Sequence, residues 1–147
     1  MKIMVTGAGG FVGSRLAAYY GKKYDVWGVT HKDLDLTDEA AVFKTVENYH
    51  PDVLIHCAAI SDVAECSKKP ELSHAVNVLG TEYLAKACGK TGTKLVMCSS
   101  DQVYFRKRGE QESLDTYLEP HREDCIETPE PLYGKQKLQG EELCLKY

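Results

Sequence analysis

The feature that most constrains this chain is the glycine-rich stretch at its N-terminus, MKIMVTGAGGFVG. The apolar run at residues 2–6 predicts a short buried strand, and three glycines follow it with the spacing G-x-x-G-x-x-G. Residues 11–20 then place apolar side chains at helical spacing. A strand, a glycine-rich turn and a helix in this order are the fingerprint of a dinucleotide-binding site.

Each of the three glycines has its own expected role. Gly7 permits a tight turn, Gly10 lets the backbone approach a pyrophosphate, and Gly13 lets the helix pack closely on the strand. The N–H groups of the first helical turn, which holds Phe11 and Val12, have no helical partner and lie at the positive end of the helix dipole. We therefore expect an anion there. The alternative is a glycine-rich turn that binds nothing.

Composition and charge exclude several classes of protein. The 147 residues suit one domain, and 43% hydrophobic with 27% charged residues is typical of a globular chain. A net charge of −4 without a long basic run argues against nucleic acid as a partner. No apolar run approaches the length of a membrane span, and no secretory signal precedes the first strand. Six scattered cysteines form no C-x-x-C pair, which argues against a metal site and favours a cytoplasmic location.

Strands and helices alternate along the chain. Further strands are predicted at 25–30, 53–57 and 94–99, and the longest helix at 70–89. Thr37 is expected to cap the helix that precedes the third strand. This alternation predicts an α/β fold with a parallel, doubly wound sheet of the Rossmann type. We expect the strand order 3-2-1-4, with a ligand at the switch point between the first and fourth strands.

The end of the second strand bears on the choice of cofactor. An acidic residue there would hold the ribose hydroxyls of NAD, whereas a cation would meet the 2′-phosphate of NADP. His31 and Lys32 occupy this place and favour NADP, although Asp33 leaves NAD open and the two cations could simply form a solvated loop. Ala58 and Ala59 follow the third strand, and such small residues leave room for a ligand across the sheet.

A candidate catalytic group lies in the last third of the chain. Residues 105–130 are polar and without period, which predicts a long surface loop. In the helix predicted after it, at 132–145, Tyr133 and Lys137 are four residues apart and share a face. Ser100 ends the fourth strand. A hydroxyl, a phenol and an ammonium beside a nicotinamide suit carbonyl–alcohol chemistry, with Lys137 expected to lower the pKa of the Tyr133 phenol.

Five stretches resemble the extended short-chain dehydrogenase/reductase family, and within it the dTDP-4-dehydrorhamnose reductases. They are VTGAGGFVGSRL, THKDLDLTD, PDVLIHCAAISDVAECSKKPELSHAVNVLGTEYLAKAC, SSDQVY and YGKQKLQGEE. The resemblance implies a hydride transfer from a nicotinamide to the keto carbon of a nucleotide-sugar. It implies that Ser100 polarises the carbonyl, Tyr133 is the catalytic acid and Lys137 assists it.

The resemblance also implies which residues surround the cofactor. Asp35 and Leu36 become neighbours of the adenine, Ala58 and Ala59 walls of the cleft, and Asn77 a structural residue behind the active site. The full cofactor set implied is Gly7, Gly10, Phe11, Val12, Gly13, His31, Lys32, Asp35, Leu36, Ala58, Ala59, Asn77, Tyr133 and Lys137.

Members of that family are roughly twice as long, so residues 1–147 are expected to form only the NAD(P)-binding domain, without the region that holds the nucleotide-sugar. The fourth strand would then be a sheet edge, which predicts self-association. Two alternatives stay open. One is a sugar-nucleotide epimerase or dehydratase, for which Asp101 beside the serine would be an added acid. The other is a cofactor-binding regulatory or vestigial module without turnover.

Overall fold

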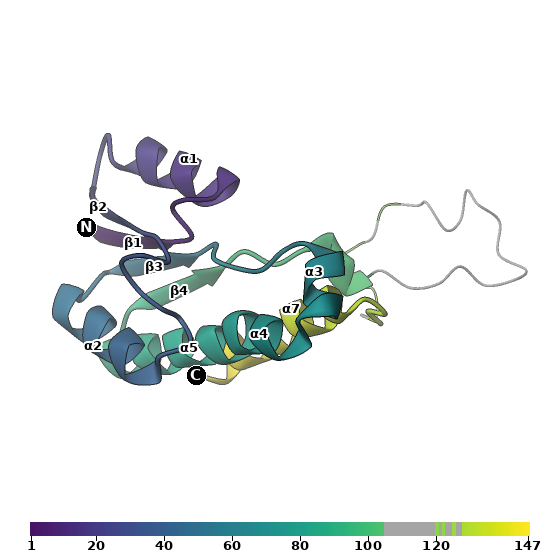
Figure 1. Ribbon diagram of the computed structural model, residues 1–147. Helices are drawn as coiled ribbons and strands as arrows, with labels where there is room; N and C mark the ends of the chain where they lie inside the picture. The colour runs from purple at the N-terminus through teal and green to yellow at the C-terminus, as the bar shows by residue number, and fades with distance from the viewer. Residues whose placement is uncertain (105–119, 121, 123–124, 126–127) are drawn as a thin grey trace, which may run out of the picture.

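The computed structural model describes residues 1–104, 120, 122, 125 and 128–147. The loop predicted at 105–130 lies almost wholly outside this range. Four strands form one parallel sheet with helices on both faces (Figure 1). The strands are β1 (Lys2–Thr6), β2 (Asp25–Val29), β3 (Val53–His56) and β4 (Lys94–Met97). The α/β fold of the Rossmann type is therefore confirmed.

The helices divide unequally between the two faces of the sheet. Helix α1 (Phe11–Tyr20) lies alone on one face in Figure 1. The opposite face carries α2 (Glu39–Tyr49), α5 (Gly80–Thr91) and α7 (Leu132–Lys146). The smaller elements are α3 (Val63–Lys68), α4 (Pro70–His74), the π-helical turn η1 (Ala75–Leu79) and the 3₁₀ turn η2 (Asp101–Tyr104). The predicted helix at 70–89 thus becomes α4, η1 and α5 in succession.

The predicted strand order is wrong in one respect. The observed order is β2-β1-β3-β4, with Ile3 opposite Val53 and Thr6 opposite His56. The reason is the face that α2 covers. Parallel crossovers are right-handed, so a helix on the face opposite α1 moves the chain back past β1 instead of onward beyond β2. The switch point is therefore between β1 and β3.

The larger hydrophobic cluster lies on the face of the sheet that carries more helices. On the α2 and α5 face, Met4, Leu54 and Leu84 are completely buried. The cluster beneath α1 is smaller, and Val96 of β4 is 42% exposed on the sheet. Among the described residues β4 pairs only with β3, so it is the expected edge strand. Self-association through this edge stays a prediction.

The predicted cap of α2 is one residue away from the observed one. Asp38 caps the helix, and its carboxylate accepts a hydrogen bond of 3.0 Å from the Ala41 N–H. The Thr37 hydroxyl instead donates to Asp35 at 2.7 Å. A carboxylate one residue later reaches the free N–H groups of the first turn, which releases Thr37 for the preceding loop. Within the described parts of the chain, no helix is both long and apolar enough to span a membrane.

Candidate active site

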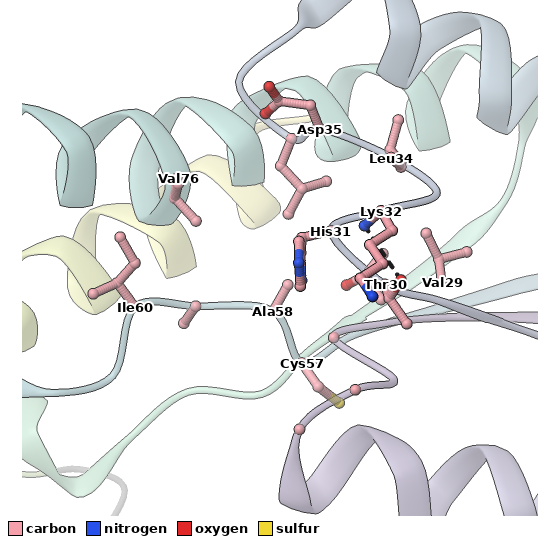
Figure 2. Close-up of a pocket in the computed structure, with 16 residues that line it drawn as sticks. Val29, Thr30, His31, Lys32, Leu34, Asp35, Cys57, Ala58, Ile60 and Val76 are labelled. Carbon is pink, nitrogen blue, oxygen red and sulfur yellow. Dashed lines mark hydrogen bonds between the residues drawn. The ribbon is translucent and has the colours of Figure 1, made fainter.

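A cleft of about 780 Å³ opens at the carboxyl ends of β1, β2 and β3 (Figure 2). It lies at the observed switch point, where ligands of doubly wound sheets bind. The lining residues are Thr6, Gly7, Gly9, Gly10, Val29, Thr30, His31, Lys32, Leu34, Asp35, Leu36, Cys57, Ala58, Ala59, Ile60 and Val76. Of the predicted cofactor residues, the structure brings together Gly7, Gly10, His31, Lys32, Asp35, Leu36, Ala58 and Ala59 around this one cleft.

The glycine turn forms one end of the cleft. Gly7 has a φ of +71°, a backbone conformation that side chains disfavour. A Cβ on Gly7 would lie 2.7 Å from the backbone nitrogen of Ala58, and a Cβ on Gly13 would overlap the carbonyl oxygen of Gly7. The turn therefore packs directly on the segment after β3, and α1 packs directly on the turn.

The N-terminus of α1 has the features of an anion site. Its N-cap is Gly10, no side chain caps it, and its first turn holds no acidic residue. The unpaired N–H groups of a first turn attract a phosphate group. Phe11 and Val12 are 73% and 50% exposed on this turn and do not line the cleft. The Phe11 ring packs instead beneath the Arg15 guanidinium, 3.5 Å from the ring centroid.

Two basic side chains line the cleft after β2, whereas the Asp33 carboxylate does not. His31 and Lys32 both line it (Figure 2). Asp33 does not, because its carboxylate accepts hydrogen bonds from the Thr30 hydroxyl and N–H at 2.7 and 2.8 Å. These hydrogen bonds lower the pKa of Asp33. This arrangement offers positive charge to a ligand at the end of β2.

Asp35 and Leu36 continue the same wall of the cleft. One carboxylate oxygen of Asp35 accepts hydrogen bonds from the Thr37 hydroxyl and N–H, and these bonds lower the pKa of Asp35. The carboxylate is thereby fixed in its ionised form beside the cleft. Ala58 lies on the segment after β3 that faces this wall (Figure 2).

The predicted catalytic residues gather beside the cleft, at the end of β4 and the start of α7. The Ser100 hydroxyl contacts the Asp101 carboxylate at 3.2 Å and accepts the Gln102 N–H at 3.2 Å. Tyr133 is 9% exposed, and burial raises the pKa of its phenol while hydrogen bonding with Ser100 opposes the rise. Gly134 lets α7 approach, because a Cβ there would overlap the Gln102 carbonyl.

Lys137 has a different contact from the one expected. Its ammonium, 4% exposed, donates a hydrogen bond to the Cys98 carbonyl, and burial lowers its pKa. The expectation that Lys137 lowers the pKa of Tyr133 is therefore wrong for this structure, in which burial of the phenol dominates. Ser100, Tyr133 and Lys137 do not line the cleft. They adjoin it through Cys98, whose sulfur lies 3.4 Å from that of the lining residue Cys57.

Asn77 holds the wall of the cleft from behind. It is 2% exposed, its Oδ1 accepts the Ile60 N–H at 2.8 Å, and its Nδ2 donates to the Ile60 carbonyl at 3.0 Å. Nδ2 also donates to Gln136 Oε1 at 2.9 Å, and Gln136 Nε2 reaches the Ser73 hydroxyl at 2.8 Å. Asn77 therefore positions Ile60 and α7, which agrees with a structural role. Gln136 was not predicted from the sequence, although a polar residue between Tyr133 and Lys137 was a signal.

His56 is a second buried polar residue whose role was not predicted from the sequence. Its Nδ1 lies 2.7 Å from the Thr6 hydroxyl and its Nε2 lies 3.0 Å from the Thr81 hydroxyl. Burial, with a smaller effect of the Lys137 charge, lowers the pKa of His56 to about 3. The ring is therefore neutral near pH 7. In the described part of the chain, no three His, Cys, Asp or Glu side chains are placed to hold a metal ion.

Comparison with known proteins gives one consistent family. The family model described as the RmlD substrate binding domain matches residues 1–147. The dTDP-4-dehydrorhamnose reductase of Mycolicibacterium smegmatis is 39% identical over 98% of this chain and 41% of its own length. Methionine adenosyltransferase 2 subunit beta of Xenopus laevis is 36% identical over 99% of this chain and 43% of its own length.

Solved structures share the same architecture. The dTDP-4-dehydrorhamnose reductase of Bacillus anthracis, solved in complex with NADP, superposes with a TM-score of 0.87 and 29% identity. The match covers 99% of this chain and 49% of that structure. The chain thus spans about half the length of the proteins that it matches.

Proposed function

Because the chain belongs to the RmlD substrate binding domain family, we propose that it forms the dinucleotide-binding and catalytic part of an NAD(P)-dependent reductase of nucleotide-linked 4-keto sugars. The observation that carries the proposal is the juxtaposition of two sites. A glycine-lined cleft lies at the switch point, and Ser100, Tyr133 and Lys137 meet at the adjoining strand end. A cofactor in the first site would present its reactive ring toward the second.

The residues present fit such a cofactor. The first turn of α1 would take the pyrophosphate, because it lacks both a side-chain cap and an acidic residue. His31 and Lys32 would hold a 2′-phosphate, and Asp35 with Leu36 would border the adenine. When bound, NADPH or NADH supplies the hydride that reduces a keto carbon.

The catalytic side chains supply the remaining chemistry. Ser100 would donate a hydrogen bond to the sugar carbonyl, and Tyr133 would deliver the proton to that oxygen as it gains charge. A phenol is protonated near pH 7 even at its ordinary pKa, so Tyr133 is in the form that a reductase requires of its acid. Lys137 would position this region through its bond to the Cys98 carbonyl.

Cofactor titration and turnover test the proposal together. We expect the chain to bind NADPH in calorimetry, and the variant Gly10→Val to lose binding because its side chain occupies the phosphate position. With a nucleotide-linked 4-keto sugar, NADPH oxidation should fall about 100-fold or more in Tyr133→Phe, whereas NADPH affinity stays unchanged. Equal turnover by Tyr133→Phe and the parent chain would exclude this residue as the acid.

A second proposal is a cofactor-binding subunit without turnover. It is favoured by the 36% identity to subunit beta of a methionine adenosyltransferase, which is named as a subunit of a different enzyme. The same experiment separates the two. Binding of NADPH without any substrate-dependent oxidation would support the subunit role.

We expect the chain to prefer NADPH to NADH, because Lys32 lines the cleft and the Asp33 carboxylate is occupied by Thr30. Lys32→Ala should weaken NADPH binding about tenfold and leave NADH binding unchanged, as expected for one charge-assisted phosphate contact. Lys22→Ala, an exposed lysine in the turn after α1, is the matched control for loss of charge. A similar loss for both cofactors would contradict recognition of a 2′-phosphate.

A further inference from the structure

Two cysteines lie side by side where β3 and β4 end. Strand register places His56 opposite Met97, and the next residues, Cys57 and Cys98, continue this pairing through a hydrogen bond from the Cys98 N–H to the His56 carbonyl. Their sulfurs are 3.4 Å apart. Both side chains are partly exposed and pack against the apolar cluster beneath α1.

We propose that Cys57 and Cys98 are a modification site that forms a reversible intramolecular disulfide with glutathione disulfide as oxidant, and that this bond weakens binding in the adjoining cleft. The first part is independent of the proposed function. The second part rests on the proposal that the cleft binds a dinucleotide.

The backbone geometry suits a disulfide. Neighbouring strands lie about 4.8 Å apart, within the Cα separation of about 4.4–6.8 Å that a disulfide requires. In-register residues of parallel strands project to the same face of the sheet, so the two Cβ–Sγ bonds need only rotate toward each other. Cys57 also lines the cleft, and Figure 2 shows its sulfur on the side that faces the first turn of α1.

The reaction balances with the oxidant named. One protein thiol loses its proton and attacks glutathione disulfide, which breaks that S–S bond and releases one glutathione thiolate. The second protein thiol then attacks the mixed disulfide, forms the Cys57–Cys98 bond and releases the second glutathione. Two protein thiols are oxidised, one glutathione disulfide is reduced, and the two protons end on two glutathione thiols.

The thiol environment selects this pair over the other cysteines. Cys66 and Cys88 are buried, and the Cys144 sulfur contacts Met97. In the described parts of the chain, no other two cysteine sulfurs lie in hydrogen-bonding contact. Burial and the neighbouring thiol raise the pKa of Cys57 to about 12. Either thiol can attack first, because the other sulfur lies 3.4 Å away and can resolve the mixed disulfide.

The pair is coupled to both parts of the candidate site. The Gly7 backbone packs so closely on Cys57 and Ala58 that a Cβ on Gly7 would lie 2.7–2.8 Å from their backbone atoms. The Cys98 carbonyl accepts the hydrogen bond from Lys137. A disulfide that draws the ends of β3 and β4 together must therefore shift the glycine turn, the Lys137 side chain or both.

Peptide mapping tests the disulfide. The native chain is incubated with glutathione disulfide, free thiols are alkylated, and cross-linked peptides are identified by mass spectrometry. We expect a Cys57–Cys98 cross-link in the parent chain and in the control Cys125→Ser. In Cys57→Ser, one glutathione should remain on Cys98. A persistent glutathione adduct on the parent chain, no oxidation, or a cross-link to another cysteine would overturn the proposal.

Cofactor titration tests the coupling. NADPH affinity should be about tenfold weaker for the oxidised chain than for the reduced chain, as for a typical coupled pair of sites, and dithiothreitol should restore it. Equal affinities would overturn the coupling. A reduced chain that binds neither NADPH nor NADH would overturn the proposed function and the coupling together, whereas the peptide map alone decides whether the disulfide forms.

Discussion

Acidification from pH 6.5 to pH 4.5 is expected to destabilise this chain through one residue, His56. The side chain is 1% exposed and its pKa is lowered to about 3, against an ordinary value of 6.5. Between these two values the unfolded state binds a proton that the folded state does not. The free energy of unfolding should therefore fall with a slope that approaches about 1.4 kcal/mol per pH unit, with a loss of about 4 kcal/mol by pH 3.

The hydrogen bonds around His56 explain why the folded state keeps the ring neutral. The Thr81 hydroxyl donates to the Asn77 carbonyl at 2.7 Å, so it accepts from Nε2–H of His56. Nδ1 then accepts from the Thr6 hydroxyl. A second ring proton would meet this hydroxyl in a buried site near the Lys137 ammonium, and both burial and that positive charge disfavour it.

Denaturant unfolding at several pH values measures this effect. His56→Gln keeps an amide donor and acceptor but cannot titrate, so its stability should vary less between pH 6.5 and 4.5. Asp33, Asp35 and Glu82, whose carboxyl pKa values are lowered, also lose stabilisation on acidification, but only at pH values near and below 4. Identical pH profiles for the parent chain and His56→Gln would contradict the prediction.

The substitution Gly7→Ala should cost about 3–4 kcal/mol of folding stability and abolish dinucleotide binding. One part of the cost is the positive φ of +71°, which disfavours any side chain by about 1–2 kcal/mol. The larger part is steric, because the new Cβ would lie 2.7 Å from the Ala58 nitrogen and 2.8 Å from the Cys57 carbonyl carbon. These are backbone atoms, so the clash cannot be relieved by rotating a side chain.

Gly92 provides a matched control for this experiment. It has a φ of +70°, and a Cβ built there meets nothing within 4 Å. Gly92→Ala should therefore cost about 1–2 kcal/mol, the backbone part alone. Denaturant unfolding of both variants isolates the steric part as the difference between them. Equal losses would show that the turn has room for a side chain.

The local elements were predictable because their signals are local. The glycine spacing identified the turn, and the apolar runs identified four strands close to their observed bounds. The strand order was not predictable in the same way. It depends on which face α2 covers, and its sequence shows an apolar side without showing against which face of the sheet that side packs.

In the candidate site, too, features set by local sequence spacing were predictable, whereas features set by contacts between distant residues were not. Spacing alone paired Tyr133 with Lys137, and the structure places both at the end of β4. The polar roles of His56 and Gln136 were not predictable from local patterns, because their hydrogen-bond partners are 25 to 63 residues away in the chain. The pairing of Cys57 with Cys98 likewise requires the register of β3 and β4, which no run of residues encodes by itself.

The unequal helix layers fix the direction in which this sheet could grow. Right-handed connections through the α2 and α5 face have moved the chain stepwise away from β2, first to β3 and then to β4. Helix α7 lies on that same face (Figure 1). Any further parallel strand joined through α7 would therefore add beyond β4, and the cleft between β1 and β3, which lies at the midline of the four described strands, would then lie nearer to the β2 edge of the wider sheet.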